Sequence, residues 1–166
     1  MTSTSRPSRY AAVVAVVTQA QVVKKFQPNY RINMLKIATT FTEIAMLLYW
    51  ILAGALFSDL ISIDPSLMYS DYENPLVIAW NWSFFPIDIA FAIIGLTARF
   101  GVRAGQLRFK LELIAGVLML CAGVMAVSYW TITCDFDPTW WGMNIWLIIL
   151  GGANLVCTQP HLTRSI

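Results

Sequence analysis

The sequence predicts an all-α protein, a four-helix transmembrane bundle that runs up-down-up-down with both termini in the cytoplasm. Its 166 residues are 58% hydrophobic and only 12% charged, which is more apolar surface than a water-soluble domain of this length can bury. Four apolar runs reach the minimum of about 17 residues that a membrane-spanning helix needs. All eleven Lys and Arg residues fall on one side of the membrane that these runs define.

The spans and the charges between them give the predicted orientation. The predicted spans are 35–57, 76–98, 111–133 and 140–157. The basic residues lie before the first span, around the connection between the second and third, and after the fourth: Arg6, Arg9, Lys24, Lys25, Arg31, Lys36, Arg99, Arg103, Arg108, Lys110 and Arg164. The other two connections carry acids and no basic residue: Asp59, Asp64, Asp71, Glu73, Asp135 and Asp137. Because cytoplasmic connections are enriched in Lys and Arg, the basic side is predicted to be cytoplasmic.

The first 33 residues form a predicted cytoplasmic segment in front of the membrane domain, residues 34–158, and residues 159–166 form a cytoplasmic tail. Within the first segment, Tyr10–Val23 is apolar but too short to span. Lys24 and Lys25 follow it in place of a small-residue cleavage site, which argues against a signal peptide. Two alternatives stay open for residues 1–33: a helix lying on the membrane surface, or a loosely ordered tail.

Local signals define the later spans. Asn74 and Pro75 are a helix N-cap and the residue preferred at the first helical position, so the second span begins there. Pro86 removes a backbone donor inside that span and predicts a kink. In the third and fourth spans, small residues at helical spacings predict close helix packing: Ala115, Gly116, Ala122, Gly123, Ala126, Gly151 and Gly152.

Three acids lie within or at the edge of the spans: Glu43, Asp88 and Glu112. Of these, Glu43 and Asp88 are the candidate catalytic acid/base or proton-sharing pair. At 1.5 Å per residue, Glu43 lies about 10 Å above Lys36 and Asp88 about 16 Å above Arg99, so the two carboxyl groups could meet. No Lys, Arg or His is expected at that depth, and an unpaired acid facing lipid is costly. Three roles remain open: acid–base catalysis by an intramembrane isomerase or cyclase on an isoprenoid-like substrate, binding of a cationic amine or proton-coupled transport, and hydrogen bonding that fixes the packing.

The tryptophans suggest where a ligand would bind. All seven lie in the outer halves of the predicted spans, and an interfacial belt explains most of them. Trp50 and Trp146 should lie below the membrane surface, which favours an aromatic-walled pocket that opens outward, with the two acids at its floor. The predicted ligand-binding residues are Asn81, Trp82, Trp50, Asn144, Trp146 and Tyr72. The ligand would be a lipophilic or amphipathic small molecule, and the pocket hypothesis fails if Trp50 and Trp146 both point into lipid.

Other site types have little support. One histidine and three dispersed cysteines give no haem, zinc or iron–sulfur pattern, and there is no phosphate-binding loop, so we expect no metal and no cofactor. Topology already explains the basic residues without a nucleic-acid partner. The expected partner is the lipid bilayer, and homo-oligomerisation is left open. Glu112 is expected to form a boundary salt bridge with Arg108 or Lys110.

Two stretches of the sequence resemble the YvaD-like family of small bacterial membrane proteins. They are DYENPLVIAWNWSFFPID (Asp71–Asp88) and LLYW (Leu47–Trp50). The similarity covers about Met34 to Cys157, and the first 33 residues extend beyond the family's compact pattern. The resemblance implies a four-helix multipass protein of the bacterial cytoplasmic membrane, with no established activity. By analogy, it also implies that the outer connection and Asp88 form one site.

Overall fold

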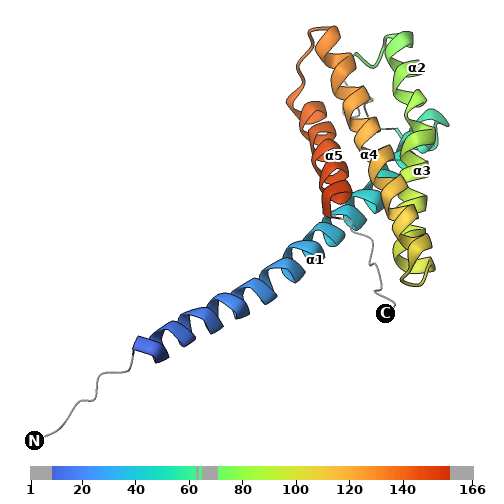
Figure 1. Cartoon of the computed structure of the whole chain (residues 1–166). Coiled ribbons are helices and arrows are strands. Elements are labelled where there is room, and N and C mark those ends of the chain that lie inside the picture. Colours follow the sequence, from blue (N-terminus) through green and yellow to red (C-terminus); the bar gives the residue numbers. More distant parts are fainter. Residues whose placement is uncertain (1–8, 63, 65–70, 158–166) are drawn as a thin grey trace, which may run out of the picture. The chain divides into compact units, whose positions relative to one another are not determined.

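The computed structural model describes residues 9–62, 64 and 71–157, and every described element is helical. The chain divides into two compact units, Met1–Lys36 and Ile37–Ile166. Helix α1 (Arg9–Phe57) begins in the first unit and ends in the second. The helices that follow belong to the second unit (Figure 1): α2 (Pro75–Ser83), α3 (Phe85–Leu96), η2 (Thr97–Gly101), α4 (Gln106–Ile132) and α5 (Pro138–Cys157).

Four helical segments are long and apolar enough to cross a membrane: Asn33–Phe57, Pro75–Gly101, Gln106–Ile132 and Pro138–Cys157. They coincide with the four predicted spans to within a few residues at each end. The all-α fold class and the four membrane-capable helices are therefore confirmed. The direction in which they would cross a membrane, and the side on which the termini lie, stay predictions.

The chain before the first span is partly described. Residues 9–33 are helical and continue into the first span as one helix, α1. The apolar segment Tyr10–Val23 is thus part of α1, and its contact with a membrane surface stays a prediction. Residues 1–8 and the whole predicted tail, 159–166, lie outside the described residues.

The second span contains the break that the sequence predicts. The side chain of Asn74 caps α2, because its Oδ1 accepts a hydrogen bond from the backbone N–H of Leu76 at 3.0 Å. Helix α2 ends at Ser83, and α3 begins at Phe85 with Pro86 in its first turn. The π-helical segment η2 then continues the helix to Gly101, three residues beyond the predicted end of the span.

Helices α4 and α5 pack closely along the predicted seam of small residues. A Cβ atom added to Gly151 would lie 2.7 Å from the backbone nitrogen of Leu120. One added to Gly123 would lie 2.7 Å from the carbonyl oxygen of Asn144. Because real side-chain atoms do not approach so closely, only glycine permits this backbone separation.

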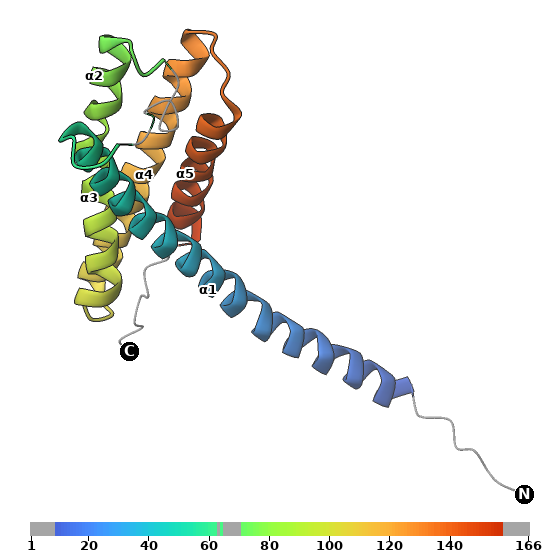
Figure 2. The same cartoon turned by 180° about the vertical axis from the view of Figure 1, so that it is seen from behind.

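The part of α1 from Ile37 onward lies across α3 and α5, as Figure 2 shows from behind. Side chains make the contact with α5. Trp146 Nε1 donates a hydrogen bond to Thr42 Oγ1 at 3.0 Å, and Asn154 Nδ2 donates one to Thr39 Oγ1 at 2.8 Å. As the residue number rises along α1 it falls along α5, so the two helices run in opposite senses where they cross.

Large apolar side chains cover the outside of the second unit. On α1 alone, the exposed ones are Ile37, Phe41, Ile44, Leu48, Ile51, Leu52 and Phe57. A patch of this extent is unfavourable in water and favourable in hydrocarbon. The surface therefore agrees with the hydropathy of the four helices.

Candidate functional site

A cavity of about 250 Å³ lies among the helices of the second unit. Its lining residues come from α1, α2, α3, α4 and α5, together with Phe84 between α2 and α3: Phe41, Thr42, Ala45, Met46, Tyr49, Trp50, Asn81, Phe84, Asp88, Ala122, Ala126, Thr139, Trp140, Met143, Asn144, Trp146 and Leu147. The lining residues that are also exposed lie on α1 and α5: Phe41, Thr139, Met143 and Trp146. The cavity therefore opens between these two helices.

Asp88 is the acid in the cavity wall. It lies in the first turn of α3 and is only 6% exposed. Its Oδ2 accepts a hydrogen bond from Nε1 of Trp50 at 3.0 Å, whereas its buried Oδ1 has no hydrogen-bond partner. A buried carboxyl oxygen without a partner costs free energy that a bound donor would recover.

Two buried amides contribute the other polar groups. Asn81 Oδ1 accepts a long hydrogen bond of 3.5 Å from the hydroxyl of Tyr49. Asn144 Nδ2 donates to the carbonyl oxygen of Trp140, one turn earlier on α5, at 2.8 Å. Each buried amide thus has a hydrogen-bond partner, and without one its burial would be costly.

Aromatic side chains form much of the remaining wall and pack behind it. The Trp50 ring lies 5.4 Å from the Trp82 ring and 5.2 Å from the Phe85 ring, centroid to centroid. Trp140 packs against Trp80 and Trp130, and its buried indole N–H has no hydrogen-bond partner. The rings of Trp50 and Trp140 thus pack against other aromatic rings where they line the cavity.

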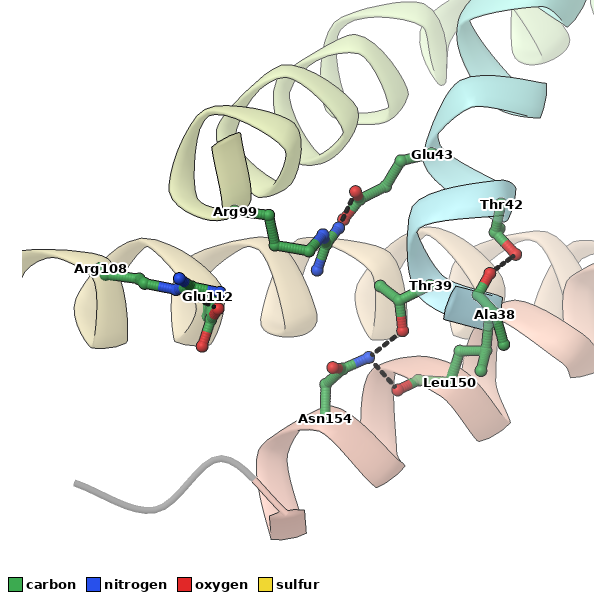
Figure 3. A network of polar contacts seen from close by, with 9 residues as sticks. All are labelled: Ala38, Thr39, Thr42, Glu43, Arg99, Arg108, Glu112, Leu150 and Asn154. Carbon is green, nitrogen blue, oxygen red and sulfur yellow. Dashed lines mark hydrogen bonds and ion pairs between the residues drawn. The ribbon is translucent and has the colours of Figure 1, made fainter. Parts of the chain in front are cut away.

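The expectation that no cation reaches the two acids is wrong for Glu43. Arg99 of η2 forms an ion pair with Glu43 of α1, and the two side chains are 9% and 0% exposed (Figure 3). The helix of the second span does not end at Ala98 but continues through η2, so Arg99 lies inside the bundle. Gly95 makes the room, since a Cβ atom at this position would overlap the Glu43 carboxyl group.

Glu43 and Asp88 consequently have separate partners. Glu43 pairs with Arg99, while Asp88 bonds Trp50, which is seven residues, or about 10 Å, further along α1 than Glu43. Glu43 is not among the lining residues of the cavity, so the predicted floor consists of Asp88 alone. A catalytic or proton-sharing role of the pair stays a prediction.

The other predicted ligand-binding residues divide into two groups. Those that line the cavity are Trp50, Asn81, Asn144 and Trp146. Trp82 packs behind Trp50, and Tyr72 lies in the turn before α2, so neither is a lining residue. Trp50 is 4% exposed and does not point into lipid. Asn81 and Asn144 are buried in the wall.

Among the residues that line the cavity, sequence reasoning missed Tyr49 and Trp140, and it missed Arg99 as the partner of Glu43. The spacing of four residues between Trp140 and Asn144 puts both on one face of a helix, so this spacing could have indicated Trp140. Nothing in the sequence indicated that Arg99 is internal. The expected boundary salt bridge is confirmed, with Arg108 Nε 2.9 Å from Glu112 Oε1 (Figure 3).

Fold and site together define a small helical protein with four membrane-capable helices around a cavity that holds one acid. The chain belongs to the family described as "Family of unknown function (DUF5360)", which matches residues 35–159. It is 40% identical over 116 residues to the "Uncharacterized protein YvaD" of Bacillus subtilis (strain 168), an alignment that covers 69% of this chain and 84% of the relative. The resemblance to a YvaD-like family is thus confirmed. No solved structure matches the chain.

Proposed function

We propose that this protein is an integral protein of the bacterial cytoplasmic membrane, with both termini in the cytoplasm, that binds a lipophilic or amphipathic small molecule in its cavity. The observation that carries the proposal is the buried Oδ1 of Asp88, which faces no partner in the wall of an aromatic-lined cavity. Buried polar groups are ordinarily hydrogen-bonded, so an exception at a cavity points to a ligand.

The size of the cavity indicates how the ligand would lie. At about 250 Å³ it is smaller than a typical ligand pocket of about 300 Å³ or more. It has room for a polar end group and a short apolar segment. A longer apolar tail would leave through the opening between α1 and α5, where Phe41 is 72% exposed and Met143 61% exposed. We therefore propose an opening towards the lipid, whereas the sequence favoured an opening towards the outer surface.

Catalysis by two carboxylates receives less support. An isomerase or cyclase with an acid and a base needs both groups at the substrate. Glu43 is outside the cavity and neutralised by Arg99, which is the arrangement expected of a packing contact. A binding role for the cavity needs Asp88 alone.

Filling the cavity tests the proposal. Ala126 lines it and is 1% exposed, so Ala126→Leu should occupy the space, whereas Ala79 is exposed and Ala79→Leu is the matched control. We expect mass spectrometry to find a small molecule retained by the wild type and by Ala79→Leu, and strongly depleted in Ala126→Leu. In parallel, a bromine-bearing alkyl amphiphile in lipid nanodiscs should quench the tryptophan fluorescence of the wild type and of Ala79→Leu more than that of Ala126→Leu. Equal quenching in all three, with no difference in retained molecules, contradicts the proposal.

A further inference from the structure

Resting on the proposed function, we infer that the polar end of the ligand is a protonated amine, held by Asp88 at Oδ1.

The charge of the cavity wall favours a cationic ligand. Among the described residues that line the cavity, Asp88 is the one carboxylic acid, and none is Lys, Arg or His. The nearby cation Arg99 is already paired with Glu43. A buried carboxylate without a counter-charge is costly, and a cationic ligand would remove that cost.

The direction of hydrogen bonding at Asp88 favours a ligand that is a donor. An ionised carboxylate only accepts hydrogen bonds, so the group that meets Oδ1 must be a donor. Oδ2 already receives the indole N–H of Trp50 at 3.0 Å, which fixes the carboxyl group and leaves Oδ1 for the ligand. An ammonium group carries three donors, and the carbonyl oxygen of Asn81 in the same wall can accept a further one.

The aromatic side chains around the cavity also favour a cation. Trp50, Trp140 and Phe84 all line the cavity. Aromatic rings attract cations through their negative faces, and cages of such rings are a recurring site for organic ammonium groups. An anionic end group would instead meet the charge of Asp88, and a hydroxyl group would supply a donor without the counter-charge.

Three ligands matched in chain length test the inference: ω-bromodecylamine, ω-bromodecanol and ω-bromodecanoate. Each is titrated into the full-length protein in phosphatidylcholine nanodiscs, and tryptophan quenching is recorded. Quenching of Ala126→Leu under the same conditions is subtracted, because it measures partition into the lipid. We expect the amine to bind at least about tenfold more tightly than the alcohol, a difference of about 1.4 kcal/mol, and the carboxylate to bind most weakly.

Two variants locate the preference. Asp88→Asn keeps the shape of the side chain and an acceptor for Trp50, and should reduce the preference for the amine to less than about threefold while the alcohol binds as before. Glu112→Gln removes an acid outside the cavity, where Glu112 pairs with Arg108, and should leave the preference unchanged. The wild-type ratio stands by itself if Asp88→Asn does not fold.

The outcomes separate the two proposals. Equal binding of amine and alcohol by the wild type overturns the amine and leaves the binding cavity standing. No quenching above the Ala126→Leu level for any of the three ligands overturns both. The amine could belong to a lipid headgroup or to a free molecule, and nanodiscs containing phosphatidylethanolamine distinguish these. Displacement of ω-bromodecylamine by that lipid assigns the headgroup, and undiminished binding assigns a free amine.

Discussion

Arg99 of η2 and Glu43 of α1 form an ion pair that is almost entirely removed from solvent. The pair joins the first span to the end of the second, so it holds α1 against the rest of its unit. Neither partner belongs to the cavity wall. The pair can therefore be altered without changing the groups that would contact a ligand.

We expect Arg99→Met to lower the free energy of unfolding by about 3–5 kcal/mol, because it leaves Glu43 buried without its counter-charge. Replacing both partners, as Glu43→Gln with Arg99→Met, should recover most of the loss. Arg103→Met is the control, since Arg103 is exposed. Unfolding in mixed micelles by increasing amounts of denaturing detergent measures all three. An Arg99→Met variant as stable as the control would refute the structural role of the pair.

Adjacent glycines on α5 allow a matched test of the close packing with α4. Gly151→Ala places a Cβ atom against the backbone of Leu120 and should destabilise the protein by about 1–3 kcal/mol. Gly152→Ala meets no atom within 4 Å and should be neutral or stabilising by up to about 1 kcal/mol. Thermal unfolding measures the stability of both variants. A Gly152→Ala protein less stable than Gly151→Ala would contradict the close packing of α4 and α5 at Gly151.

The hydrogen bond from Trp50 to Asp88 should contribute measurably to stability. Trp50→Phe keeps an aromatic ring but leaves Oδ2 of Asp88 without its donor, at an expected cost of about 1–3 kcal/mol. Trp141→Phe is the control, because its 3.3 Å bond to the Asp135 carbonyl is exposed, and its effect should stay within about 0.5 kcal/mol. Equal losses of stability in both variants would show that the buried hydrogen bond contributes no more than the exposed one.

Much of the fold could be predicted from hydropathy and local signals. A membrane span depends on the summed apolarity of its residues, so its limits are visible in one sequence. The cap at Asn74 and the break near Pro86 also follow from local chemistry. The depth of individual charges could not be predicted in the same way. A long side chain such as that of Arg99 lies inside or outside the bundle according to where its helix ends and which neighbour it reaches.

The site was predictable only in part for the same reason. The sequence indicated that Asp88, Asn81 and Asn144 are polar groups in apolar spans. Which of them share a cavity depends on the rotation and depth of each helix relative to its neighbours. The pairing of Trp50 with Asp88, and the exclusion of Glu43, arise from that relative placement.

The opening of the cavity is crossed by a hydrogen bond that should slow ligand exchange. Thr42→Val keeps the shape of the side chain but removes the acceptor for Trp146 Nε1, which lies 3.0 Å away. We expect the dissociation rate of ω-bromodecylamine to rise several-fold, on the order expected for about 1 kcal/mol, with a smaller change in association. Stopped-flow recovery of tryptophan fluorescence measures both rates, and an unchanged dissociation rate would exclude this bond as a latch.

The predicted orientation can be tested with the native thiol at the end of α4. Cys134 is exposed, and it should react with a membrane-impermeant maleimide added to intact cells. In a background with Cys121, Cys134 and Cys157 all changed to Ser, Arg103→Cys should react only after the membrane is permeabilised. The reverse pattern would place the termini outside and contradict the cytoplasmic assignment.

An experimental structure of the protein with ω-bromodecylamine bound would show directly whether the cavity holds an amine at Asp88. We expect bromine density at or just beyond the opening between α1 and α5, and an amine nitrogen at hydrogen-bond distance, about 3 Å, from Oδ1 of Asp88. Bromine density confined to the surrounding lipid, with the cavity empty or filled by side chains, would contradict it.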